Sequence, residues 1–187
     1  MAEASTDRSR APVVLRGLRP GDLGWIVYSQ GKGYAEHYGW NGEYEALVAR
    51  IVADFAAEHG AGDGPKREAG WIAEIDGRPV GSILCVSADP GNPDADTAKL
   101  RLLWVEPAGR GRGVGTMLVR RCVDFAREQG YTAMTLWTTS MLHPALRLYR
   151  AAGFTLASEE PVRLFGQDDL TAQVWELDLR TGGGPQN

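Results

Sequence analysis

Hydrophobic and polar positions change from a strand-like to a helix-like pattern near the middle of the chain. An apolar run over 100–105 ends at Pro107 and is followed by a glycine-rich turn over 109–115. From Val114 the apolar residues recur at the spacing of one helix face, and charged residues occupy the opposite face. This stretch predicts a strand, a glycine-rich turn and the N-terminus of a helix.

Two further helices are predicted in the first third of the chain. Asp22 can cap a helix over 23–30, and Asn41 can cap a second helix that ends near Glu58. The segment 31–40 between them is rich in glycine and aromatic residues, so we expect it to interrupt the helical pattern.

Apolar or alternating segments predict β-strands in the rest of the chain. These segments are 13–18, 71–75, 78–87, 98–105, 133–138, 154–165 and 171–179. Asp76-Gly77, between the second and third of them, is typical of a type I′ hairpin turn. The element order β-α-α-β-β-β-α-β-α-β-β then predicts a single α/β (α+β) domain over 12–180, with disordered ends at 1–11 and 181–187.

The composition excludes several classes of protein. The 187 residues are 43% hydrophobic and 24% charged, as in one globular domain with a sizeable core. The formal net charge of −4 argues against a nucleic-acid binder. The first residues lack the apolar core of a signal peptide, and no apolar run approaches the roughly 20 residues of a membrane span. We therefore predict a cytoplasmic protein that does not associate with membranes.

The cysteines and histidines form no disulfide or metal pattern. Cys85 lies in an apolar run and Cys122 on the apolar helix face, so we expect both to be buried thiols in a reducing compartment. His37, His59 and His143 lack metal-ligand spacing to other residues, and we predict no metal.

The glycine-rich turn has the properties of an anion site. The first N–H groups of a helix have no intrahelical acceptor and lie at the positive end of the helix dipole, so they suit phosphates. Arg110 and Arg112 add positive charge. The Lys-Ser/Thr pair of a mononucleotide phosphate loop is absent after Gly115, and the next strand ends in Thr138-Thr139 instead of the acidic residue of a dinucleotide fingerprint. A nucleotide-binding α/β protein is therefore the weaker interpretation.

Two motifs resemble the signatures of the GNAT superfamily of N-acyltransferases. R-x-x-G-x-G at 110–115 resembles the acyl-CoA-binding motif of that family, and A-x-x-x-Y-x-x-x-G-F at 145–154 resembles its second signature, on a short helix. The resemblance covers about 13–179. It implies a mixed, mostly antiparallel sheet of about seven strands, flanked by about four helices and splayed between the fourth and fifth strands. Within the superfamily, the chain looks most like the acetyltransferase domains that are fused to MarR-type regulators.

The resemblance also implies a site for acetyl-CoA (coenzyme A) between the splayed strands. Tyr149 would be the general acid that protonates the departing thiolate, and the N–H of Val105 would polarise the thioester carbonyl. The residues implied to contact the cofactor are Leu103, Trp104, Val105, Arg110, Gly111, Arg112, Gly113, Val114, Gly115, Thr116, Thr139, Leu142, Ala145 and Tyr149.

The general base is not found where many family members carry it. The corresponding positions of the fourth strand hold basic residues instead of a Glu. Glu36 and His37, in the aromatic segment that lines the acceptor site in the family, are the favoured candidates, and Glu74 and Glu106 are alternatives. A chain of water molecules could also replace a dedicated base.

The acceptor is expected to be a primary amine of a small molecule or peptide. Tyr28, Tyr38 and Trp40 are expected to line its site, and Arg101 could pair with a carboxylate of an amino-acid-like substrate. The acetyl group would pass directly to the amine in a ternary complex. The alternative from another class is an acyl-CoA-binding sensor without turnover. A homodimer through the last strands, common in the family, is possible.

Overall fold

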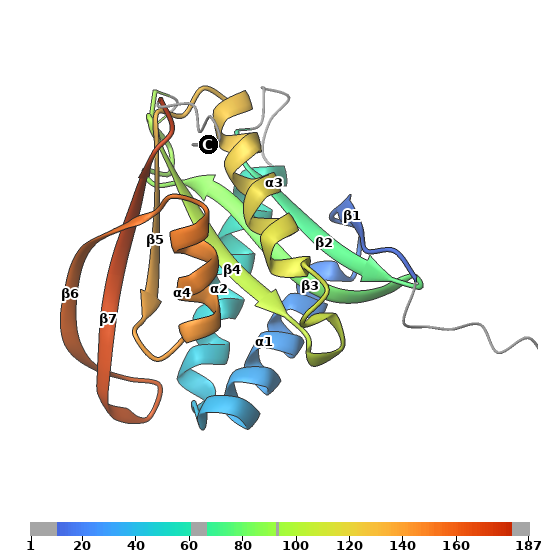
Figure 1. Ribbon diagram of the computed structural model, residues 1–187, viewed down its shortest axis with the longest axis vertical. Coiled ribbons are helices and arrows are strands. Elements are labelled where there is room, and N and C mark those ends of the chain that lie inside the picture. Colours follow the sequence, from blue (N-terminus) through green and yellow to red (C-terminus); the bar gives the residue numbers. More distant parts are fainter. Residues whose placement is uncertain (1–10, 61–66, 93, 181–187) are drawn as a thin grey trace, which may run out of the picture.

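The computed structural model describes residues 11–60, 67–92 and 94–180, which form a seven-stranded sheet with helices on both faces (Figure 1). The strands are β1 (Val14–Gly17), β2 (Ala69–Ile75), β3 (Arg78–Ser87), β4 (Thr97–Val105), β5 (Ala133–Thr139), β6 (Thr155–Leu164) and β7 (Gln167–Asp178). The helices are α1 (Asp22–Tyr38), α2 (Gly42–Gly60), α3 (Val114–Glu128) and α4 (His143–Ala151). The segments 1–10 and 181–187, predicted to be disordered, lie outside the described residues.

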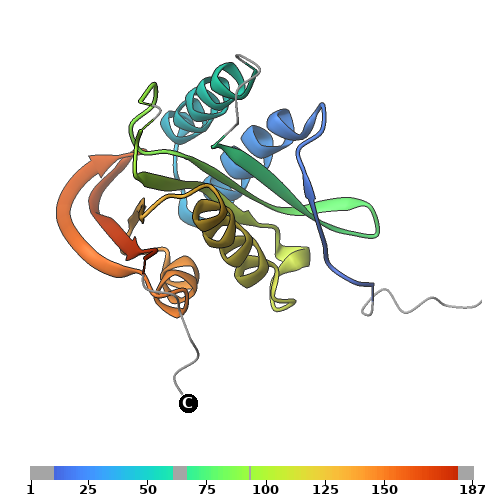
Figure 2. The same cartoon turned by 90° about the horizontal axis from the view of Figure 1, so that it is seen from above.

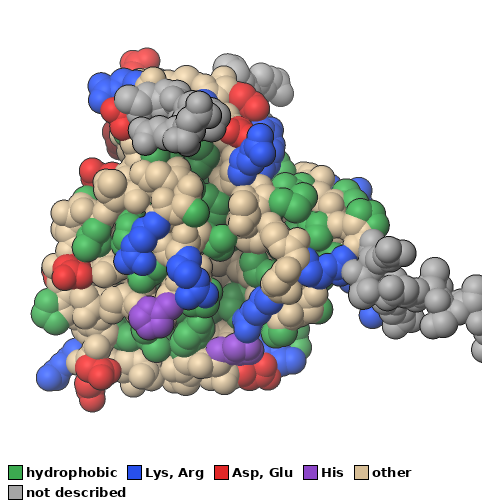
Figure 3. Space-filling view, viewed as in Figure 1, with side chains coloured by type: hydrophobic (Ala, Val, Ile, Leu, Met, Phe, Trp, Pro, Cys, Tyr) green, Lys and Arg blue, Asp and Glu red, His purple; other side chains and the backbone are tan. Residues whose placement is uncertain are grey.

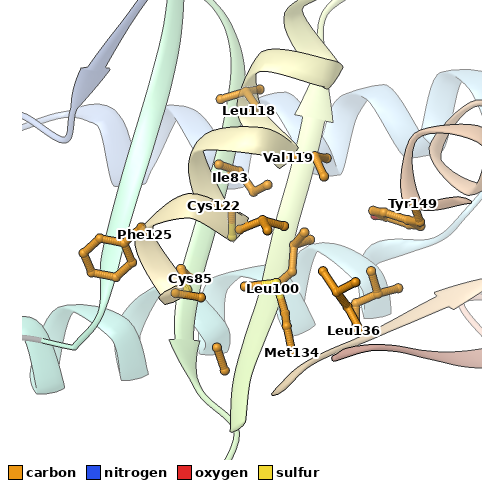
Figure 4. Packing of buried hydrophobic residues seen from close by; sticks show 14 of the residues in the cluster. Ile83, Cys85, Leu100, Leu118, Val119, Cys122, Phe125, Met134, Leu136 and Tyr149 are labelled. Carbon is orange, nitrogen blue, oxygen red and sulfur yellow. The ribbon is translucent and has the colours of Figure 1, made fainter. Parts of the chain in front are cut away.

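The sheet is mixed and mostly antiparallel, as the resemblance implied. Its strand order is β1-β2-β3-β4-β5-β7-β6, and β4 with β5 is the parallel pair. Helices α1 and α2 cover one face of the sheet, and α3 and α4 cover the other (Figure 2). Between the sheet and α3 the core contains Leu100, Met134 and both cysteines, Cys85 and Cys122, which are buried free thiols (Figure 4).

Two local predictions about turns and caps are confirmed. Asn41 caps α2, because its Oδ1 accepts a hydrogen bond from the N–H of Glu43 at 3.0 Å. Asp76 and Gly77 have φ values of 52° and 70° at the β2–β3 turn. Positive φ at both central residues is what a type I′ turn requires.

Helix α1 runs without a break through most of the segment that we expected to interrupt it, and this prediction was wrong. The glycines there allow close packing. A Cβ on Gly31 would lie 2.9 Å from Cγ of Glu45, and a Cβ on Gly33 would lie 2.2 Å from the ring of Trp104. The helix ends only at Gly39, whose φ is 68°. The glycines within α1 therefore allow α2 and β4 to approach it, and do not turn the chain.

Asp22 is the first residue of α1 and not its cap, contrary to the sequence prediction; Gly21 occupies the cap position. The Asp22 carboxylate accepts hydrogen bonds from Arg16 at 2.6 Å and from the N–H of Arg19 at 2.5 Å. Arg16 also binds Glu74 of β2 at 2.7 Å. Burial alone would raise the pKa of Asp22, but the hydrogen bonds outweigh it and lower that pKa. This charged cluster joins β1, β2 and the start of α1.

A bulge in β4 lies where this strand separates from β5. The two strands pair over 97–99 and 133–135 and then diverge, as the resemblance implied. Leu102 has a φ of 52°, and the register against β3 shifts beside it. The carbonyl of Leu102 accepts hydrogen bonds from Nε2 of Gln30 at 3.0 Å and from Oγ of Ser82 at 3.2 Å. These contacts to α1 and β3 hold the bulge in place.

The bulge changes which residues of β4 face each helix layer. Leu100 packs in the core beneath α3, and beyond the bulge Leu103 and Val105 occupy that side. Lys99 and Arg101 alternate with Leu100, so they face the layer of α1 and α2. The open end of β4 therefore presents basic residues to one face and apolar residues to the other.

Candidate active site

Two cavities flank the splayed end of β4. The α2-side cavity has a volume of about 670 Å³ and lies between the sheet, α1 and α2. The α3-side cavity, of about 470 Å³, lies between β4, the glycine-rich turn and α4. Figure 3 shows a hollow with hydrophobic walls between α3 and α4, with Lys and Arg side chains near it. Tyr34, Leu103, Leu142 and Ala145 line both cavities, so the two meet where β4 leaves β5.

The glycine-rich turn supplies one wall of the α3-side cavity. Gly111 and Gly113 have φ values of 73° and 75°, which favour glycine. Helix α3 then begins without a side-chain cap, and the N–H groups of 114–116 have no intrahelical acceptor. Arg110 and Arg147 line the same cavity. Free backbone donors, the positive end of a helix and two guanidinium groups together form a site for phosphates.

Val105 presents its backbone to the gap between β4 and β5. The next residue, Glu106, donates its N–H to the carbonyl of Val80 in β3 at 2.8 Å. Because the backbone groups of successive strand residues point in opposite directions, those of Val105 point away from β3. Nε of Arg110 donates to the Val105 carbonyl at 3.3 Å, which agrees with this orientation. The N–H of Val105 therefore faces the α3-side cavity, which this residue lines.

Two buried tyrosines lie close to the junction of the cavities. Tyr149 of α4 lines the α2-side cavity, and its hydroxyl has no hydrogen-bond partner within the described residues. Burial raises the pKa of Tyr149 well above its ordinary value, and Tyr34 and Cys122 raise it further. Burial also raises the pKa of Tyr34 to about 12. Both phenols therefore keep their protons at neutral pH, and the protonated form is the one that can act as an acid.

Comparison with known proteins identifies the family. The model of the acetyltransferase (GNAT) family matches residues 36–154. The chain belongs to the GNAT family. It is 36% identical over 110 residues to N-acetyltransferase family 8 member 2 of Rattus norvegicus, covering 59% of this chain and 45% of that protein. It is 34% identical over 89 residues to N-acetylaspartate synthetase of Danio rerio, covering 48% of this chain and 30% of that protein. The chain thus matches less than half the length of these relatives.

Solved structures share the GNAT fold over nearly the whole chain. The yncA protein of Salmonella typhimurium, solved with its cofactor acetyl-CoA, has a TM-score of 0.71 at 22% identity and covers 94% of this chain and 99% of its own. An N-acetyltransferase of Staphylococcus aureus Mu50 has a TM-score of 0.73 at 18% identity, with 90% of this chain and 99% of its own covered. These likenesses show the fold alone.

Membership of the acetyltransferase family indicates an acyltransferase, and one neighbour of the same fold was solved with acetyl-CoA as its cofactor. The residues of the α3-side cavity fit this cofactor. Coenzyme A carries phosphate groups, and the free N–H groups of 114–116 with Arg110 and Arg147 are suitable donors for them. A Cβ at Gly111 or Gly113 would meet open space, so the turn leaves room for a ligand beside it.

Most residues that the resemblance assigned to the GNAT cofactor line the α3-side cavity. They are Leu103, Trp104, Val105, Arg110, Gly111, Gly113, Val114, Gly115, Thr116, Leu142 and Ala145. Arg112 and Thr139 line neither cavity, so their contact with the cofactor stays a prediction that the cavities do not support. Arg112 donates a hydrogen bond to the carbonyl of Ala11. Thr139 is the last residue of β5; it is fully buried and pairs with Ala172 of β7. Tyr149 borders the α2-side cavity instead.

The residues predicted for the acceptor site are only partly brought together. Trp40 and Arg101 line the α2-side cavity. Tyr38 lines the α3-side cavity, and Tyr28 lines neither. The side chain of Tyr28 is 62% exposed and lies beside Lys32, because the continuous helix α1 turns it to solvent. The continuous helix therefore does not bring Tyr28 and Tyr38 to the α2-side cavity.

The predicted bases do not line either cavity. Glu36 and His37 are exposed on α1 and line neither cavity, although the His37 ring lies 6.3 Å from the ring of Trp104 between centroids, so their role as a base stays a prediction. Glu74 is held in the charged cluster at β1, and Glu106 lines neither cavity. The acidic residue that lines the α2-side cavity is Glu43, in the first turn of α2, which the sequence analysis did not select.

The tertiary structure adds further residues to the α2-side cavity that the sequence analysis did not select. Among these are Tyr34, Arg50, Trp137 and Arg163. Tyr34 could have been found, because it belongs to the aromatic segment that the family likeness points to. Arg50, Trp137 and Arg163 lie on α2, β5 and β6, and no local pattern links these elements to one site.

Two negative findings concern the described part of the chain. No three His, Cys, Asp or Glu side chains there are grouped as a metal site would require. None of the described helices is long and apolar enough to cross a membrane.

Proposed function

We propose that this GNAT protein transfers the acetyl group of acetyl-CoA to a primary amine of a small molecule, by direct attack with both substrates bound. The junction of the two cavities at Tyr34, Leu103, Leu142 and Ala145 carries the proposal. A donor in the α3-side cavity and an amine in the α2-side cavity would meet beside the open edge of β4. The volume of about 670 Å³ suits a small molecule.

Three groups of this chain have the chemistry that the transfer needs. Acetyl-CoA supplies an activated thioester carbonyl. The N–H of Val105 can donate a hydrogen bond to the carbonyl oxygen as charge develops on it. Glu43 can accept the proton that the ammonium form of the substrate must lose, and Tyr149 can donate a proton to the departing sulfur. The orientation of Val105, the position of Glu43 in the cavity and the raised pKa of Tyr149 support these roles.

We also propose that the acceptor carries a carboxylate that binds Arg101. The Arg101 side chain lines the α2-side cavity, is half-buried and has no ion-pair partner within the described residues. A guanidinium group in such a site binds a carboxylate through two parallel hydrogen bonds. One relative is named N-acetylaspartate synthetase, after an acetylated amino acid, which supports this class of substrate.

Substitution Arg101→Ala is expected to raise the KM for an α-amino acid and to leave the KM for its uncharged amide unchanged. A hydrogen-bonded pair with a charged group contributes about 1.5–3 kcal/mol, which corresponds to roughly 10- to 100-fold in KM. The measurement is steady-state CoA release with both amines. Arg120→Ala is the matched control, because the side chain of Arg120 is 82% exposed on α3 and lines neither cavity. An equal change in KM for both amines would contradict the carboxylate role.

The pH dependence of kcat provides a separate check on Tyr149. Because burial raises the pKa of Tyr149, its acid form persists through the range near pH 10 where an ordinary tyrosine loses its proton. We therefore expect no fall in kcat from this phenol up to about pH 10. A fall at lower alkaline pH that disappears in the Tyr149→Phe variant would show that its pKa is not raised.

A further inference from the structure

The α2-side cavity concentrates positive charge in a chain whose net charge is negative. Its lining includes four basic side chains, Arg50, Lys99, Arg101 and Arg163, and one carboxylate, that of Glu43. The whole chain has 20 Lys and Arg against 24 Asp and Glu. The excess of cations in this cavity is therefore the reverse of the overall composition.

The four cations come from three separate elements. Lys99 and Arg101 lie two residues apart on β4 and share the face that looks toward α2. Arg50 lies on α2, and Arg163 lies on β6 close to the β6–β7 turn. The fold thus provides a pair of cations on the sheet and one further cation on each of two walls.

None of these four cations is neutralised by an ion pair within the described residues. Burial and the neighbouring Arg101 lower the pKa of Lys99, and burial lowers the pKa of Arg101. Asp54 of α2 attracts Arg101, but it does not line the cavity. Lys99 and Arg101 are half-buried, whereas Arg50 and Arg163 are exposed at the edge of the cavity. Holding the two half-buried like charges together is unfavourable, and a bound anion removes that cost.

One carboxylate does not use all of the donors that these groups offer. Its two oxygens have about four lone-pair sites, and the ammonium of Lys99 and the guanidinium of Arg101 together have more N–H donors than these sites accept. With Arg101 and Lys99 occupied by one anionic group, Arg50 and Arg163 would remain without a partner in the same cavity. Trp40 also lines this cavity, and its uncharged aromatic ring does not neutralise any of the four cations.

We propose that the acceptor of this protein is a small primary amine that carries two anionic groups, one bound at Lys99 and Arg101 and the other at Arg50 and Arg163. This inference rests on the proposed function, because it assigns the α2-side cavity to the acceptor. Glu43, as the acidic residue of the lining, then faces the ammonium group. A dicarboxylic amino acid and an amino acid with a phosphate ester share this chemistry.

The test compares isosteric acceptors that differ by one negative charge. We would measure kcat/KM from CoA release for L-glutamate against L-glutamine, L-aspartate against L-asparagine, and O-phospho-L-serine against L-serine. In at least one pair we expect the doubly anionic member to be preferred by tenfold or more. A largest ratio in the glutamate or aspartate pair indicates that the second anionic group is a carboxylate, and a largest ratio in the phosphoserine pair indicates a phosphate.

Variants then locate the second anion. Arg50→Gln and Arg163→Gln are each expected to reduce the ratio of the preferred pair toward one, and Arg120→Gln is expected to leave it unchanged. In parallel, calorimetric titration of each amino acid into the protein saturated with CoA measures binding without turnover. Turnover with ratios near one in all pairs would overturn the dianion inference and leave the transferase proposal intact.

Other outcomes separate the two proposals. Tight, Arg163-dependent binding of a dianion without CoA release would support the dianion site and overturn acetyl transfer to such an amine. If no dianion binds more tightly than its singly charged partner in calorimetry, the inference is wrong whatever the turnover.

Discussion

Replacing Tyr149 by Phe is expected to lower kcat by about 10²- to 10⁴-fold, the usual contribution of a general acid, and to leave the KM for acetyl-CoA nearly unchanged. The hydroxyl of Tyr149 has no hydrogen-bond partner within the described residues, so its loss should not alter the fold. The ring would still pack against Phe154, with ring centroids 6.0 Å apart in the wild type. The measurement is steady-state CoA release, with thermal unfolding as a check on stability.

Tyr131→Phe is the matched control for this substitution. Tyr131 is also buried, but its hydroxyl donates to the carbonyl of Arg67 at 3.2 Å and it lines neither cavity. We expect this variant to lose about 1 kcal/mol of stability and to keep its kcat. If Tyr149→Phe keeps full kcat, the proton for the departing sulfur comes from another group, and Tyr34, which lines both cavities, becomes the first alternative.

Replacing Gly33 by Ala is expected to destabilise the protein by about 1–3 kcal/mol, the usual cost of overpacking a core. A Cβ at Gly33 would lie 2.2 Å from two ring carbons of Trp104, a rigid side chain that is 5% exposed. Because Trp104 lines the α3-side cavity, its displacement should also weaken acetyl-CoA binding. Chemical denaturation and calorimetric titration with acetyl-CoA measure the two effects.

Gly24→Ala in the same helix separates packing from helix propensity. Gly24 lies in the first turns of α1, and a Cβ there would meet no atom within 4 Å. This substitution should stabilise the protein by about 0.5–1 kcal/mol, because alanine favours the helix more than glycine does. If both variants are equally stable, Gly33 is not a site of close approach and α1 does not pack on Trp104 as described.

Features that depend on neighbouring residues in the sequence were predictable. The strand, glycine-rich turn and helix around Val114 follow from local spacing, and so do the Asn41 cap and the Asp76-Gly77 turn. The position of Tyr149 beside the cleft followed from its motif on α4. In each case the pattern lies within about a dozen residues, so no long-range contact was needed to recognise it.

Features that depend on distant residues were not predictable. Gly33 was predicted to be part of a break, because the Trp104 ring that requires a glycine there is remote in the sequence. The bulge at Leu102 depends on hydrogen bonds from Gln30 and Ser82, and it decides which face Leu103 takes. Arg163 reaches the cavity only because β6 and β7 fold over it.

Several expectations from the sequence stay predictions. They include the disorder of the chain ends, the cytoplasmic location, a homodimer and the special likeness to domains fused to MarR-type regulators. The roles of Val105, Glu43 and Tyr149 in acetyl transfer are proposals that the variants above address.

The most direct test of acetyl transfer is the initial rate of CoA release with acetyl-CoA and an anionic amino acid both varied. We predict release that depends on the amine, with double-reciprocal lines that intersect, because the amine attacks while both substrates occupy the joined cavities. Binding of acetyl-CoA without any amine-dependent release would contradict the account and favour a sensor. Parallel lines would contradict direct transfer and indicate an acetylated enzyme.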